Sequence, residues 1–254
     1  MPASTPNRCR AAIFGATSDI ANSVARQLAE DVGAQLVLIA RDATALTSAA
    51  VDLKARGAVE CRTQQADFAD TESLAVVVEA AWNAFSGLDL ALIAYGTSPD
   101  QSLAETDAMV ARGALTVNFV SPALLCAALA PRFEAQRSGV IAVITSVAGE
   151  RGRKSSYVYG AAKGGLQRYL EGLRHRLFRA GIVVLDIRPG LVATKMTAAL
   201  AKGGPFWATP DKVATDILAA IRKRKSVLYT PRFWRLIMLI VRNLPAAFFH
   251  RSSL

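Results

Sequence analysis

The chain has 254 residues, of which 52% are hydrophobic and 20% charged, and its formal net charge is +10. This length is sufficient for one large α/β domain with a well-buried core, and the apolar content excludes a disordered chain. The three cysteines, Cys9, Cys61 and Cys126, show neither metal-binding nor redox spacing, and His175 and His250 are isolated. We therefore expect reduced thiols, as in a cytoplasmic protein, and no metal site.

The first predicted elements are a strand at residues 10–14, a tight turn and a helix. This order is typical of a dinucleotide-binding fold, in which free N–H groups at the helix N-terminus bind phosphate. Gly15 is the only glycine of the usual three, so the motif is weak, and a plain turn capped by Thr17, Ser18 or Asp19 is the alternative. We expect the acidic Asp19 to point outward or to cap the helix, where the helix dipole favours a negative charge.

The second predicted strand, residues 35–40, ends where a dinucleotide-binding fold selects its cofactor. An acidic residue there holds the ribose diol of NAD, whereas an arginine accommodates the 2′-phosphate of NADP. The residue after this strand is Arg41, which favours NADP(H) over NAD(H). Asp42 follows immediately, so a solvated Arg–Asp pair in a loop is the alternative.

Two further strands, near 88–94 and 181–187, are predominantly apolar, as expected for strands buried on both faces. The first leads to Gly96, where a glycine allows close backbone approach to a cofactor. The second runs into the turn of Pro189 and Gly190, at the carboxyl end of a strand, where open α/β sheets bind ligands. The remaining strands are predicted near 58–64, 139–145 and 226–229. The predicted fold is therefore α/β, a Rossmann-type, doubly wound parallel sheet of seven strands in a single domain.

Tyr159 is the only tyrosine with a lysine, Lys163, four residues later. Four residues make one helical turn, so both side chains project from the same helix face. A lysine cation favours the phenolate and lowers the tyrosine pKa from its usual ~10, which suits reversible carbonyl/alcohol chemistry. Taken alone, the pair is equally consistent with a packed tyrosine and a surface lysine.

These ordered motifs, up to about residue 230, resemble the short-chain dehydrogenase/reductase family. The resemblance implies reduction of a ketone to an alcohol. It makes Tyr159 the general acid, and it makes Lys163 the partner of both Tyr159 and the nicotinamide ribose. It implies that Ser146 donates a hydrogen bond to the substrate carbonyl and that Asn118 supports a water between Lys163 and solvent.

The resemblance also implies the cofactor contacts. Asp67 would meet the adenine ring, while Thr194 and the backbone of Val192 would bind the carboxamide. The expected cofactor-binding residues are Gly15, Thr17, Ser18, Asp19, Ile20, Arg41, Asp67, Phe68, Ala94, Gly96, Tyr159, Lys163, Pro189, Gly190, Val192 and Thr194.

Four short motifs indicate a subgroup of that family: Ala-Thr-Ser-Asp-Ile at the first turn, Ala-Tyr-Gly, Ser-Val-Ala-Gly-Glu-Arg and Val-Tyr-Gly. The subgroup that they resemble reduces a 2-keto-pentose carried on a polyprenyl phosphate, after a partner flavoenzyme has oxidised the sugar. Two alternatives stay open. One is a general reductase of acyl-thioester or other soluble ketones, and the other is a non-catalytic dinucleotide-binding regulator.

The C-terminal segment, residues 231–254, is basic and rich in aromatic side chains. From Ile217 to the end there are eight Lys/Arg and no acidic residue. A helix over this segment would place Arg232, Arg235 and Arg242 on one stripe, with the remainder apolar. Its apolar run is shorter than the ~20 residues of a spanning helix, so it would rest on anionic lipid or pack on protein. No recognition motif supports nucleic-acid binding.

We accordingly expect a reductase domain at residues 1–230 with a substrate lid near 195–210, followed by the C-terminal segment. The N-terminal residues contain no apolar segment of the kind that signal peptides carry. The family resemblance implies a homodimer or homotetramer formed through long helices near 103–135 and 155–178.

Overall fold

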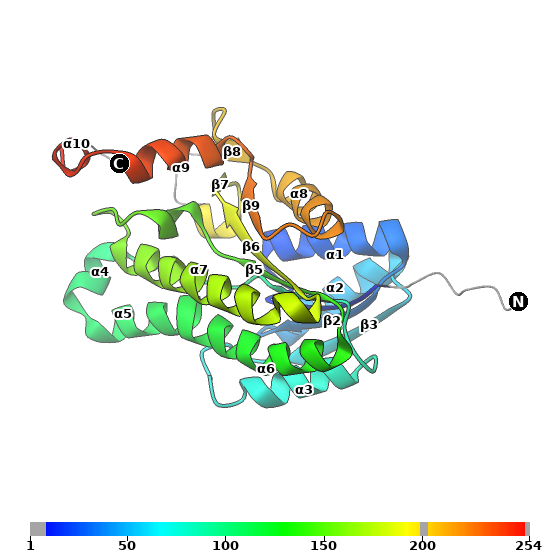
Figure 1. Ribbon diagram of the computed structural model, residues 1–254. Coiled ribbons are helices and arrows are strands. Elements are labelled where there is room, and N and C mark those ends of the chain that lie inside the picture. The colour runs from blue at the N-terminus through cyan, green and yellow to red at the C-terminus, as the bar shows by residue number, and fades with distance from the viewer. Residues whose placement is uncertain (1–8, 199–202, 252–254) are drawn as a thin grey trace, which may run out of the picture.

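A seven-stranded parallel sheet forms the centre of the protein, with strand order β3-β2-β1-β4-β5-β6-β9 (Figure 1). The structure is a computed structural model that describes residues 9–198 and 203–251. The strands are β1 (Arg10–Phe14), β2 (Gln35–Ala40), β3 (Glu60–Gln65), β4 (Leu90–Ile93), β5 (Val140–Ile144), β6 (Val183–Pro189) and β9 (Val227–Thr230). The predicted doubly wound, seven-stranded parallel sheet is confirmed, and each strand end lies within two residues of its prediction.

Helices cover both faces of the sheet. Helices α1 (Asp19–Val32), α2 (Ala43–Ala55) and α8 (Pro210–Arg222) lie on one face, and α3 (Leu74–Asn83), α6 (Ser121–Gln136) and α7 (Tyr157–Leu177) on the other (Figure 1). Ser18, Asp42 and Thr209 begin three of these helices, each accepting a hydrogen bond from the backbone N–H three residues later. Such caps satisfy N–H groups that the helix itself leaves free.

The two layers of helices create two halves of the core, separated by the sheet. Ala11 and Ile13 of β1 pack on the side of α1 and α8, while Ala12 and Phe14 pack on the side of α6 and α7. Successive side chains of a strand point to opposite faces, so a strand between two layers must be apolar at every position. This explains the continuous apolar runs in the sequence.

The chain between β4 and β5 forms a broken helical segment rather than one long helix. It comprises α4 (Gln101–Thr106), α5 (Ala108–Leu115), a π-helical turn (Thr116–Val120) and α6. Within the described residues, Ala108–Gln136 is the one helical stretch long and apolar enough to cross a membrane by length and composition. Half of its most apolar window is buried, and it packs against α3 and α7, as a core helix does.

The C-terminal segment differs from the single helix that was predicted. It forms α9 (Trp234–Asn243) and α10 (Ala246–Phe249), because Pro245 cannot continue the helix and forces Leu244 into an extended conformation. The expected arginine stripe is correspondingly reduced to Arg235 and Arg242, since Arg232 precedes α9. Of the expected lid near 195–210, residues 199–202 lie outside the described part of the chain. Near the end of this stretch, Trp207–Ala208 form β8, which pairs with β7 (Leu191–Val192).

Candidate active site

Ser146, Tyr159 and Lys163 meet beside the carboxyl end of β5. Ser146 follows this strand by two residues, and the other two residues lie on the first turns of α7. The Ser146 side chain lies close enough to the Tyr159 hydroxyl to favour the phenolate. Lys163 Nζ donates to the Ile144 carbonyl at 3.1 Å and lies 5.9 Å from the centre of the Tyr159 ring. The structure thus brings together the three side chains that the sequence pattern singled out.

Glycines on α7 allow the Ser146 loop to lie directly against the helix. A Cβ on Gly164 would lie 2.7 Å from the carbonyl oxygen of Gly149, and a Cβ on Gly160 would lie 3.0 Å from that of Ala148. Real Cβ atoms essentially never approach backbone to 2.7 Å. The glycines therefore set the spacing between Ser146 and the hydroxyl of Tyr159.

Gln167 holds the backbone of Ser146, and sequence reasoning missed it. Its Nε2 donates to the Ser146 carbonyl at 2.7 Å, and the side chain is buried. The Ser146 hydroxyl oxygen in turn accepts from the Ala148 N–H at 3.1 Å. The available signal was spacing, because Tyr159, Lys163 and Gln167 follow one another at intervals of four residues and share one helix face.

The pKa of Tyr159 moves in the direction opposite to the prediction. Burial raises it above the ordinary value, against the lowering effects of the hydrogen bond to Ser146 and the charge of Arg153. Burial also lowers the pKa of Lys163 to about 8, although the carboxylate of Asp186 raises it. The prediction that Lys163 lowers the Tyr159 pKa is therefore wrong, because removal from water penalises the phenolate and the ammonium alike. A protonated Tyr159 is the form that can give a proton to a developing alkoxide.

Asn118 is fully buried in the π-helical turn and secures the loop after β4. Its Oδ1 accepts from the Thr97 N–H at 3.1 Å, and its Nδ2 donates to the carbonyls of Thr97 and Ala114, each at 3.0 Å. A Cβ on Gly96 would lie 2.7 Å from Asn118 Oδ1 and 3.5 Å from Lys163 Nζ. The loop glycine is thus required for Asn118 to approach the backbone beside Lys163. Single π-helical turns of this kind occur frequently at functional sites.

The turn after β1 leads directly to the N-terminus of α1, in spite of its missing glycines. Gly15 has φ +89°, and a Cβ there would lie 2.8 Å from the Cβ of Tyr95. Ser18 caps α1, so the alternative caps Thr17 and Asp19 are excluded. The Asp19 carboxylate instead accepts from the Lys195 N–H at 2.7 Å, linking the start of α1 to the segment after β7. Ile20 follows in the first turn of α1, whose N-terminus is suited to an anion.

At the end of β2, Arg41 is exposed and its neighbour Asp42 caps α2. The Asp42 carboxylate accepts from the Ala45 N–H at 2.9 Å. It is therefore already engaged, whereas NAD-binding folds use a carboxylate here for the ribose diol. Asp42 therefore forms this cap and not the solvated pair with Arg41 that was the alternative.

Beyond β3, Asp67 and Phe68 have different environments. Asp67 is exposed and accepts from the Ala69 N–H at 3.0 Å, which leaves it accessible to a ligand. The ring of Phe68 is buried and stacks on Tyr95, with 4.0 Å between the ring centres. Only the Phe68 backbone can therefore contact a cofactor. The Tyr95 hydroxyl lies 2.7 Å from Ser121 Oγ, so this tyrosine anchors the loop of Ala94 and Gly96 to α6.

At the end of β6, the turn of Pro189 and Gly190 lies beneath Trp234 of α9. A Cβ on Gly190 would lie 1.9 Å from the Trp234 Nε1, so only glycine fits. The next residues fold back on themselves. The Thr197 hydroxyl donates to the Val192 carbonyl at 2.6 Å and accepts from the Thr194 N–H at 3.1 Å. Trp234 is a further residue of this site that the sequence patterns did not identify.

Two residues just after Ser146 fasten α9 to the site. The Glu150 side chain is 2% exposed and lies 3.4 Å from both Arg188 Nη1 and Arg242 Nε. Arg151 Nη1 donates to the carbonyls of Val241, Arg242 and Leu244 at 2.5, 3.2 and 2.6 Å. These carbonyls lie at the C-terminal end of α9, where helix carbonyls lack their usual partners, although that of Val241 also accepts from the Leu244 N–H at 3.4 Å. No sequence spacing indicates a contact across 90 residues.

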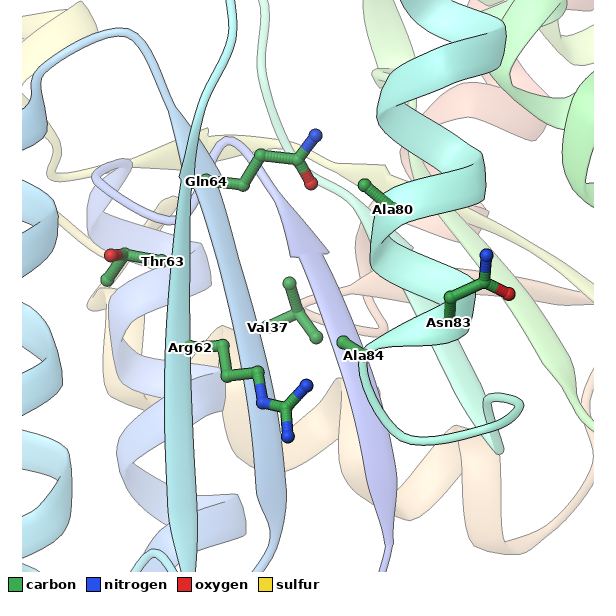
Figure 2. Close-up of a pocket in the computed structure, with 7 residues that line it drawn as sticks. All are labelled: Val37, Arg62, Thr63, Gln64, Ala80, Asn83 and Ala84. Carbon is green, nitrogen blue, oxygen red and sulfur yellow. The ribbon is translucent and has the colours of Figure 1, made fainter.

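One cavity of about 400 Å³ lies away from these residues, between β3 and α3. Figure 2 shows the side chains of Arg62 and Gln64 pointing from β3 toward Ala80 of α3 and Ala84, the residue that follows α3. It contains none of the predicted catalytic or cofactor-binding residues, so the candidate site rests on the side chains at the carboxyl ends of the strands.

Known proteins are similar to this chain in both sequence and fold. The family described as short chain dehydrogenase matches residues 10–204. An uncharacterised oxidoreductase of Mycobacterium tuberculosis strain H37Rv is 35% identical, over 92% of each chain. Another, from Streptomyces coelicolor, is 34% identical over 94% of each chain.

Among solved structures, a short-chain dehydrogenase of Sphingobium yanoikuyae in complex with NADPH has a TM-score of 0.80 and 24% identity, over 93% of this chain and 97% of that one. A Burkholderia cenocepacia short-chain dehydrogenase in complex with NADP has a TM-score of 0.82 and 19% identity, over 97% and 98%. At these identities the likeness establishes the fold. Together with the family match over most of its length, it shows that the chain belongs to the short-chain dehydrogenase family and is an NAD(P)-dependent oxidoreductase.

Proposed function

We propose that the protein reduces the 2-keto group of a pentose carried on a polyprenyl phosphate. This is the reaction of decaprenylphosphoryl-2-keto-erythropentose reductase, whose short motifs this sequence resembles. The observation that carries the proposal is the role of one of these motifs. In Ser-Val-Ala-Gly-Glu-Arg, the Gly149 backbone packs on α7, while Glu150 and Arg151 hold α9. The motif thus joins the reacting residues to a C-terminal helix with exposed apolar side chains.

In the proposed mechanism, a nicotinamide cofactor held beside Tyr159 and Lys163 would supply the hydride that reduces the carbonyl carbon. Ser146 donates a hydrogen bond to the carbonyl oxygen and holds it beside Tyr159. Tyr159, protonated because of its raised pKa, gives its proton to the alkoxide oxygen. Lys163 would bind the nicotinamide ribose and, with a pKa of about 8, would relay the replacement proton. Asn118 positions the loop beside Lys163 for access to water.

For the cofactor we propose a preference for NADP(H) over NAD(H). Arg41 would pair with the 2′-phosphate, the N-terminus of α1 with the pyrophosphate, and Asp67 with the adenine. The backbone of Val192 and the Thr194 hydroxyl would bind the carboxamide. The solved relatives bound to NADPH and NADP are consistent with this preference.

We further propose a cytoplasmic enzyme that works with a flavoenzyme oxidase, which would supply the keto-sugar. Leu103, Met109, Leu115 and Leu124, on the helical segment between β4 and β5, expose apolar surface that suits a dimer or tetramer contact.

The first test is a fluorescence titration of the purified protein with NADPH and NADH. Tighter NADPH binding supports the assignment of Arg41, and tighter NADH binding overturns that assignment alone. Next, oxidation of NADPH is followed with the polyprenyl-phosphate keto-pentose, an acyl-thioester ketone and a simple soluble ketone. Turnover of the keto-pentose alone supports the proposal, whereas preference for a soluble ketone replaces it with the general reductase.

The Tyr159→Phe variant separates an enzyme from a regulator. It keeps the ring and should keep cofactor binding, but it removes the proton donor, so turnover should fall by roughly 10²- to 10⁴-fold. Absence of turnover in the native protein, together with failure to bind either nucleotide, would favour the non-catalytic regulator.

A further inference from the structure

Helix α9 exposes a row of large aliphatic side chains to solvent. Leu236, Leu239 and Ile240 are 63%, 50% and 60% exposed, whereas Met238 on the opposite side of the helix is 6% exposed. Trp234, Ile237 and Val241 also face the body of the protein and are partly buried. We call the three exposed residues the α9 face. It faces outward because the other side of the helix already packs on the protein.

Exposed aromatic side chains lie near both ends of α9. Phe206 and Phe233 are 51% and 38% exposed and lie edge to face, with 6.0 Å between their ring centres. Both also contact Trp234, at 6.4 and 5.9 Å. Phe248 of α10 is 67% exposed. Aromatic rings beside an aliphatic helix face are typical of segments that lie at a membrane surface.

The charged side chains that the C-terminal segment itself exposes beside the α9 face are all basic. Arg232, Arg235 and Arg242 are exposed. From residue 217 to the end of the chain there is no acidic residue. Glu150, the acidic partner of Arg242, is buried and therefore adds no exposed negative charge. This surface is complementary to anionic lipid headgroups rather than to the mixed charges of an ordinary protein surface.

The α9 face is fixed beside the reaction site. Trp234 covers Gly190 at one end of α9, and Arg151 binds the carbonyls at the other. Figure 1 shows α9 on the opposite side of the molecule from α5 and α6, where the proposed subunit contact lies. The helix has ten residues, about 15 Å, so it can lie on a bilayer but cannot span one.

We infer that the α9 face rests on an anionic membrane surface and turns the mouth of the active site toward the lipid. The benefit of such a contact rests on the proposed function, because a polyprenyl-phosphate sugar could enter the site while its tail stays in the bilayer. Leu236, Leu239 and Ile240 would enter the interfacial layer, and Arg232 and Arg235 would meet lipid phosphates.

The test is sedimentation of the full-length protein with vesicles of phosphatidylcholine alone or mixed equally with phosphatidylglycerol. We expect binding to the mixed vesicles that weakens with added salt, and little binding to phosphatidylcholine alone. Each of Arg232→Gln and Arg235→Gln should weaken binding about fivefold. The double variant Leu236→Ser/Ile240→Ser should abolish it. Val76→Ser is the matched control, since Val76 is a 68% exposed apolar residue on α3 and its loss should change nothing.

Light scattering and turnover assays distinguish the other outcomes. If the double variant lowers the subunit number, the α9 face contacts a second copy and the inference is wrong. Equal vesicle binding by the native protein and the double variant also overturns it. Turnover of detergent-solubilised keto-sugar by a protein that does not bind vesicles would refute the membrane contact and leave the proposed function intact. Vesicle binding without keto-sugar turnover would support the membrane contact and refute the proposed function.

Discussion

The contact between α7 and the Ser146 loop can be tested by adding a single methyl group. In Gly164→Ala the new Cβ would lie 2.7 Å from the Gly149 carbonyl oxygen, whereas ordinary contacts begin at 3.4 Å. Helix and loop must therefore separate by about 0.7 Å, the difference between these two distances. Neither atom belongs to a flexible side chain, so the backbone itself must move.

Overpacking of this kind destabilises by about 1–3 kcal/mol, while alanine in place of a helical glycine stabilises by about 0.5–1 kcal/mol. The net expectation is a loss of up to about 2 kcal/mol in the free energy of unfolding. The effect on chemistry should be larger. A displacement approaching 1 Å between Ser146 and Tyr159 should lower kcat by roughly 10- to 100-fold, with smaller change in NADPH affinity.

Gly172→Ala is the matched control, because Gly172 lies on the same helix, is exposed, and its added Cβ meets nothing within 4 Å. This variant should gain about 0.5–1 kcal/mol and keep its kcat. Urea denaturation and initial rates of NADPH oxidation measure both quantities. If Gly164→Ala matched Gly172→Ala in stability and rate, the glycine contact would not be what positions Ser146.

Three further predictions concern charge and hydrogen bonding. Lys163→Met should raise the free energy of unfolding at pH 7 by up to ~3 kcal/mol, because burial lowers the folded-state pKa of Lys163 from 10.5 to about 8. The native protein should regain this stability as the pH rises from about 8 to 10.5. If urea denaturation finds the variant less stable than the native protein at pH 7, the assignment of a buried, charged Lys163 is wrong. Arg41→Ala should weaken NADPH binding by roughly 10- to 100-fold and leave NADH binding unchanged. The control is Asp42→Ala, which removes a helix cap and should lower stability without changing the binding of either nucleotide. Equal losses of affinity for both nucleotides would refute the 2′-phosphate contact. Gln167→Leu leaves the Ser146 carbonyl without its donor and should lower the free energy of unfolding by about 1–3 kcal/mol. It should also lower kcat more than it raises KM. An unchanged kcat at reduced stability would show that Gln167 has a purely structural role.

Local features of the sequence determined much of the architecture. Predominantly apolar runs identified most of the parallel strands, because a strand between two helical layers must be apolar on both sides, whereas the edge strand β3 is largely polar. The spacing of Tyr159 and Lys163 placed them on one face of α7 in the same way, because helical geometry depends on separations of a few residues. The Gly15 turn was recognisable for its positive φ, although the sequence could not choose among three caps.

Features that depend on distant segments required the tertiary structure. The contacts of Glu150 with Arg242 and of Trp234 with Gly190 join parts of the chain that no periodicity connects. The direction of the Tyr159 pKa shift was predicted wrongly, because a neighbouring charge can be read from spacing but burial cannot. The sequence by itself therefore determined which elements form and which residues carry the chemistry. The packing of those elements decided how the residues are spaced, how strongly they hold their protons and which helix closes the site, since each of these depends on atoms brought together only by folding.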